Sequence, residues 1–139
     1  MRTIRIVLLA AALGLTAVAC GSSSGASDTS AETTAPEDAR TDAAAVATGL
    51  ADIGKTAAEV AAAAAIDKDK AVTLDEKIEP TWAKIEGTIK ANDQDAYLAF
   101  EDAFATLADA AKAGDAAKAA GATGAIAKAI TAYVAKYPG

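Results

Sequence analysis

The fold class is decided by residues 96–111, which read AYLAFEDAFATLADAA. Large apolar residues recur there every three or four positions, at Tyr97, Phe100, Phe104 and Leu107. That spacing places them on one face of an α-helix, and the alanines between them are the strongest helix formers. The stretch therefore predicts an amphipathic helix whose aromatic face is turned towards a core.

Three further stretches repeat this helical spacing. Their leading apolar residues are Val46, Leu50, Ile53 and Val60, then Leu74, Ile78, Trp82, Ile85 and Ile89, and finally Ile126, Ile130, Tyr133 and Tyr137. A lone tryptophan on such a face is expected in the core, with a partner for its indole N–H.

Turn and capping residues separate the four stretches. Pro36 favours a helix start, and Pro80 lies inside the second stretch, where we expect a kink near Glu76. Asn92-Asp93 and Gly114-Asp115 are typical of helix ends followed by N-caps. Short turns make neighbouring helices antiparallel. We therefore expect an all-α domain over residues 37–139, an up-down-up-down four-helix bundle.

The first nineteen residues have the layout of a secretory signal peptide. Arg2 and Arg5 precede an uncharged apolar run over residues 6–19. The run ends in AVAC at residues 17–20, which resembles the lipobox of bacterial lipoproteins, although that motif usually has leucine where Ala17 stands. The resemblance implies cleavage before Cys20, which would carry S-diacylglycerol and N-palmitoyl groups at the extracytoplasmic side of the cell membrane. The alternative is an ordinary signal peptide that leaves a free thiol.

Residues 20–36 are rich in Ser, Thr, Gly and Ala and lack large apolar side chains. Such a segment cannot bury enough surface to order itself. We interpret it as a flexible linker that holds the domain about 20 Å from the lipid.

Composition excludes several classes of function. The net charge of −6 becomes −8 once residues 1–19 are removed, which disfavours nucleic acid as a partner. The chain has no histidine and one cysteine, so no His-based relay, His metal site or internal disulfide is available. We expect no catalytic residues and no enzyme.

Carboxylates and a phenol are the remaining candidates for chemistry. Glu79 and Glu86 are seven residues apart and share a helix face, and Glu101 lies one turn after Tyr97. Folding the two helices together about the turn at Asn92 would bring these groups close, with Glu86, Glu101 and Tyr97 nearest. Oxygen ligands of this kind suit Fe(III), Ca²⁺, Mg²⁺ or Mn²⁺. The alternative is that these acids flank the core and pair with neighbouring lysines or solvent.

Two segments, IEPTWAKIEGTIK at residues 78–90 and DAYLAFED at 95–102, carry a family resemblance. They resemble the helical extracytoplasmic segment found with bacterial iron permeases, and more distantly the imelysin-like iron-uptake proteins. The resemblance implies a bacterial lipoprotein of actinobacterial source. The resemblance implies a helical domain that presents metal near a membrane transporter, with Glu86 and Glu101 as ligands. Imelysin-type proteins carry a His-x-x-Glu pair that this chain lacks.

Two functions remain open at this point. One is a non-enzymatic lipoprotein accessory to metal (iron) uptake, with a membrane transporter or other extracytoplasmic protein as its partner. The other is a structural or protein-interaction module with no metal or ligand site. Convergence of Glu86 and Glu101 would favour the first, and an exposed apolar patch would favour the second.

Overall fold

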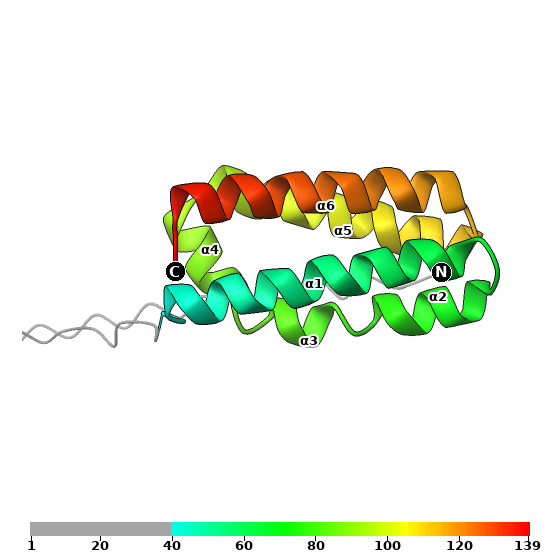
Figure 1. The fold of residues 1–139 in the computed structure, drawn as a ribbon, viewed down its shortest axis with the longest axis horizontal. Helices are drawn as coiled ribbons and strands as arrows, with labels where there is room; N and C mark the ends of the chain where they lie inside the picture. The colour runs from blue at the N-terminus through cyan, green and yellow to red at the C-terminus, as the bar shows by residue number, and fades with distance from the viewer. Residues whose placement is uncertain (1–39) are drawn as a thin grey trace, which may run out of the picture. The chain divides into compact units, whose positions relative to one another are not determined.

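The computed structural model describes residues 40–139, and this part of the chain is all-helical, as the sequence predicted (Figure 1). The predicted signal peptide, lipidated Cys20, linker and helix start at Pro36 lie outside the described residues. The six helical segments are α1 (Ala43–Ala64), α2 (Lys68–Asp75), α3 (Glu79–Trp82), α4 (Glu86–Asn92), α5 (Gln94–Ala113) and α6 (Ala116–Lys136).

The boundaries of α5 and α6 follow the predicted capping residues. The Asp93 carboxylate accepts a hydrogen bond from the backbone N–H three residues later at 3.0 Å, and Asp115 does the same at 2.9 Å. Each bond satisfies a backbone donor that the first helical turn leaves free. Gly114 ends α5 with φ of 67°, a left-handed conformation that glycine adopts without strain. These local signals fix where both helices begin and end.

The sequence predicted that the second apolar stretch forms one kinked helix, and this prediction is wrong. In its place the chain forms α2, α3 and α4, with non-helical turns between them. Pro80 lies in the first turn of α3, where its missing N–H removes no helical bond. Before it, Lys77 N–H donates to the Leu74 carbonyl and Ile78 N–H to the Asp75 carbonyl, both at 3.0 Å. These tighter i→i+3 bonds end α2 and redirect the chain. The number and lengths of the helices therefore differ from the predicted four.

The turn between α1 and α2 is short. Asp67 already caps α2, because its carboxylate accepts the Lys70 N–H at 3.0 Å. Only Ala65 and Ile66 lie between α1 and this cap, and the Ile66 side chain is 88% exposed.

Helix α1 packs against α2, α3 and α6, while α5 packs against α2, α4 and α6 (Figure 1). Two glycines of α1 allow close approach. A Cβ at Gly49 would lie 3.2 Å from Ile85 Cδ1, and one at Gly54 would lie 3.1 Å from Ile130 Cδ1. Inside a helix a glycine costs about 1 kcal/mol relative to alanine. In the structure they make room for isoleucine side chains of neighbouring elements.

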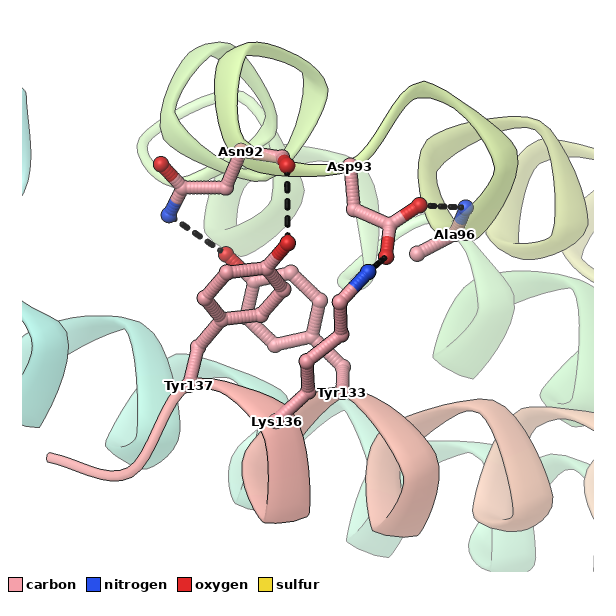
Figure 2. A network of polar contacts seen from close by, with 6 residues as sticks. All are labelled: Asn92, Asp93, Ala96, Tyr133, Lys136 and Tyr137. Atoms are coloured by element: carbon pink, nitrogen blue, oxygen red, sulfur yellow. Dashed lines mark hydrogen bonds and ion pairs between the residues drawn. The ribbon is translucent and has the colours of Figure 1, made fainter.

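Polar contacts fasten α6 to the corner between α4 and α5, as Figure 2 shows. Asn92 Nδ2 donates to the Tyr133 hydroxyl at 3.0 Å, and the Tyr137 hydroxyl donates to the Asn92 carbonyl at 2.8 Å. The Lys136 ammonium binds the Asp93 carboxylate at 2.8 Å. The start of α1 and the end of α6 lie at this same end of the domain (Figure 1). Across residues 40–139, no helix combines the length and the apolar character that a membrane span requires.

Candidate functional site

Trp82 ends α3 and is the centre of an aromatic cluster with α5. Its side chain is 2% exposed, and its ring centroid lies 5.0 Å from Phe104, 5.3 Å from Phe100 and 6.0 Å from Tyr97. The indole N–H donates to Glu101 Oε1 at 2.6 Å, a short bond to a charged acceptor. The prediction of a core tryptophan with one polar partner is confirmed. The bond also holds the Glu101 carboxylate against the edge of the indole.

The four predicted metal ligands lie around this cluster. Glu79 begins α3, Glu86 begins α4, and Tyr97 and Glu101 lie on α5. Burial raises the pKa of the Tyr97 phenol, and the negative charges of Glu101, Glu86 and Glu79 raise it further. All three acids therefore lie close enough to act on one hydroxyl. Within residues 40–139, however, no three Asp, Glu, Cys or His side chains are placed to hold one metal ion.

Tyr97 already has a cation on its ring. The Lys90 ammonium lies 5.0 Å from the ring centroid, a cation–π contact. A tyrosine binds metal as phenolate, and the surrounding acids oppose the loss of its proton. Tyr97 therefore fits a packing role better than a ligand role.

A cavity of about 340 Å³ lies beside Trp82 and shares Phe104 and Glu101 with the aromatic cluster. Its lining comprises Asp75, Glu76, Ile78, Glu79, Trp82, Glu101, Phe104, Ala105 and Ala108. Four of these nine residues are acids and none is basic, so the lining combines apolar and aromatic side chains with negative charge. We call it the acidic groove. It brings together two predicted residues, Glu79 and Glu101, but does not include Glu86 or Tyr97.

Asp75 and Glu76 belong to the acidic groove although the sequence did not indicate them. Asp75 is half-buried. Burial raises the pKa of its carboxyl, the charge of Lys112 opposes that rise, and Glu76 adds to it. Asp75 lies four residues before Glu79, a spacing typical of side chains on one helix face, and this was the signal that could have found it.

The charge of the acidic groove suits a positively charged ligand, although its acids are not grouped around a single point as metal ligands would be. Gathered carboxylates produce a negative potential, and a partly desolvated one such as Asp75 gains when a cation arrives. The volume falls within the range of small-molecule sites, and the Trp82 and Phe104 rings supply an apolar wall. The comparisons with protein families, with curated proteins and with solved structures found no match for this chain.

Proposed function

We propose that this protein binds a cation in the acidic groove and acts, without catalysis, as an extracytoplasmic accessory of metal uptake. The observation that carries this proposal is the Glu101 carboxylate, held by the Trp82 indole at 2.6 Å on the wall of a cavity lined by three more acids. Carboxylate oxygens are hard ligands, so Fe(III), Mn²⁺ and Ca²⁺ are the first candidates. Residues 78–90 and 95–102 resemble iron-permease-associated segments, and for that reason we propose to test iron first.

Anchoring through Cys20 is the second part of the proposal. The AVAC sequence at residues 17–20 and the absence of any other cysteine in the chain support it. A Cys20→Ala substitution should move the protein from the membrane fraction to the soluble fraction, or leave the signal peptide uncleaved. A Cys20→Ala protein that is processed and still sediments with membranes would contradict the anchor.

The arrangement that we propose for residues 43–136 is a four-helix bundle whose second member is broken into α2, α3 and α4. The contacts of α1 with α2 and α6, and of α5 with α2 and α6, support this description. Because of these breaks, Glu79 and Trp82 lie on the short helix α3. Both side chains line the acidic groove.

Calorimetric titration tests the cation site. The chain from residue 21 onwards would be titrated with Fe(III)-citrate, Mn²⁺, Cu²⁺ and Ca²⁺, beside an Asp75→Asn/Glu79→Gln variant. Glu86→Gln is the matched control, because Glu86 lies near Tyr97 but does not line the groove. Saturable binding that is lost in the double variant and kept in Glu86→Gln would support the proposal. Binding lost only with Glu86 would move the site to Tyr97, and no binding to any ion would contradict a metal-handling role.

An interaction module without a ligand site is the second candidate, and Ile66 favours it. This side chain is 88% exposed in the α1–α2 turn, beside an open cavity of about 430 Å³ lined by Ala62, Ala63 and Leu74 among others. Glu59, Asp67 and Lys70 also line this cavity, so it combines apolar and charged side chains. An exposed large apolar residue in such a place is typical of contact surfaces. An Ile66→Ser variant should lose crosslinking to a membrane partner while it keeps any cation binding. Unchanged crosslinking would remove this candidate surface.

A further inference from the structure

We infer that Thr41 is a strap that ties the start of the domain to the turn between α3 and α4, and that release of this strap loosens the wall of the acidic groove. Two hydrogen bonds form the strap. The Thr41 backbone N–H donates to Thr88 Oγ1 at 2.9 Å, and the Thr41 hydroxyl donates to the Lys84 carbonyl at 2.7 Å. One residue therefore holds two points that lie 47 and 43 positions further along the chain.

The α3–α4 turn depends on the strap because it has little local support. Ile85, the N-cap residue of α4, makes no side-chain capping bond, so α4 begins without the support that a polar cap gives. The strap binds Lys84 just before this position and Thr88, which is 9% exposed, just after it. Helix α1 has its own cap, since the Asp42 carboxylate accepts a backbone N–H of its first turn at 2.8 Å. Release of Thr41 therefore acts on the start of α4 and leaves α1 capped.

The α3–α4 turn leads directly into the wall of the acidic groove. Only residues 83–85 separate Trp82, which lines the groove, from the first residue of α4. The Trp82 indole holds the Glu101 carboxylate at 2.6 Å, so a movement of the turn acts on this bond. Ile85 keeps its contact with α1 when Thr41 is released, because it is 3% exposed and lies against Gly49. Release should thus open the segment locally without unfolding the domain.

Thr41 lies at the point where the preceding chain enters the domain. A displacement of that chain reaches Thr41 through Arg40, before it reaches the capped start of α1. A pull from the membrane anchor proposed at Cys20 is such a displacement. Coupling between two sites is reciprocal, so a ligand that fastens Trp82 also fastens the strap. The inference concerns the regulation of the acidic groove, and it rests on the proposed function for its effect on cation binding.

Hydrogen exchange followed by two-dimensional ¹⁵N NMR of the chain from residue 21 onwards tests the coupling in both directions. The reporters are the Trp82 indole N–H and the Thr41 backbone N–H, which should both be less protected than the amides of α5. Thr41→Val keeps the shape of the side chain but removes its hydroxyl, so exchange of the indole N–H should become about three- to tenfold faster. Glu101→Leu removes the acceptor of the indole N–H, and exchange of the Thr41 N–H should rise by a similar factor.

Thr48→Val is the matched control, because the Thr48 hydroxyl donates to a carbonyl of its own helix at 2.9 Å; it should leave both reporters unchanged. Unchanged indole exchange in a folded Thr41→Val protein, or unchanged Thr41 exchange in a folded Glu101→Leu protein, would overturn the inference. Protection of both reporters equal to that of α5 would also overturn it, because the segment would then open only with the whole domain. If one variant fails to fold, the other still tests the coupling. These measurements contain no cation, so their failure and a failure of cation binding are distinguishable.

Discussion

The hairpin of α5 and α6 and the broken segment of α2 to α4 are built in different ways. In the hairpin, Asp93, Gly114 and Asp115 set the helix boundaries through bonds within a few residues of themselves. In the broken segment, α3 and α4 have no side-chain cap. Their turns are held from other elements, since the Thr41 hydroxyl donates to the Lys84 carbonyl at 2.7 Å. Local chemistry is sufficient for the hairpin, and tertiary contacts define the broken segment.

The two regions also contribute differently to the stability of the fold and to the candidate binding site. The long, regular helices supply most of the packed framework, while the irregular segment supplies Asp75, Glu76 and Glu79 of the acidic groove. A continuous helix in its place would keep the fixed 3.6-residue spacing of its side chains. The breaks allow the acids to gather on one side of Trp82.

Removal of the Trp82 side chain should have the largest effect. Trp82→Ala deletes the central ring of the aromatic cluster and the partner of Glu101, and should lower the free energy of unfolding by about 3–5 kcal/mol. Urea denaturation followed by circular dichroism measures it. Ile66→Ala, at an 88% exposed position, is the control and should change stability by less than about 0.5 kcal/mol. Equal effects of the two substitutions would contradict the role given to Trp82.

Loss of the hydrogen bond between Thr41 and Thr88 should give the second-largest loss of stability. Thr88→Val keeps the shape but removes the acceptor of the Thr41 N–H, which should cost about 1–3 kcal/mol. Urea denaturation gives the size of the loss, and hydrogen exchange should show faster opening of α4 than of α5. Thr131→Val is the matched control, because the Thr131 hydroxyl donates only to a carbonyl of its own helix. If α5 opened as fast as α4, the two regions would not differ as described.

Two glycine-to-alanine substitutions compare the stability effect at an open position of α6 with that at a position of α1 packed against the broken segment. A Cβ at Gly124 in α6 would meet nothing within 4 Å, so Gly124→Ala should stabilise the domain by up to about 1 kcal/mol. Gly49→Ala gains the same helix propensity but must displace Ile85, 3.2 Å away. Thermal unfolding should therefore rank Gly124→Ala above Gly49→Ala. The reverse order would show that α1 and the α3–α4 turn are not closely packed.

Loss of the Asp93–Lys136 ion pair should change the stability least, and the size of the change should depend on pH. The hydrogen bond from Lys136 lowers the pKa of Asp93, and the hydrogen bond from the Ala96 N–H lowers it further. The ionised Asp93 therefore stabilises the fold, and this contribution is lost as pH falls through the lowered pKa. The bond to Asp93 raises the pKa of Lys136, whose contribution is lost as pH rises through the raised value. At pH values between the pKa of Asp93 and the pKa of Lys136, Lys136→Met should lower Tm slightly. Below the first pKa and above the second, the Tm of the variant should equal that of the unmodified protein. A pH-independent difference would contradict the pairing.

Much of the framework could be predicted from the sequence because its signals are local. The spacing of Phe100 and Leu107 gave the buried face of α5, and the caps gave its ends. Breaks in the segment after Leu74 could not be placed, since Pro80 indicates a bend but not which distant residue holds the next turn. The contact of Thr41 with Lys84 spans 43 residues and leaves no local pattern.

The candidate site could be predicted in part for the same reason. Glu79 and Glu101 were identified from helical spacing and do meet in one cavity. Glu86 was predicted to lie near Tyr97 and Glu101. Its charge does raise the pKa of Tyr97, but Glu86 does not line the cavity that Glu79 and Glu101 share. Asp75 was missed because its spacing of four residues from Glu79 was not considered beside the Glu79 and Glu86 pair.

Fluorescence of Trp82 gives the most direct test of the acidic groove, because Trp82 is the single tryptophan of the chain and lines that cavity. The account predicts that Fe(III)-citrate or Mn²⁺ changes its emission saturably, that Asp75→Asn/Glu79→Gln abolishes the change, and that Glu86→Gln preserves it. Emission that stays constant through every titration, or that changes equally in the double variant, would contradict a cation site beside Trp82.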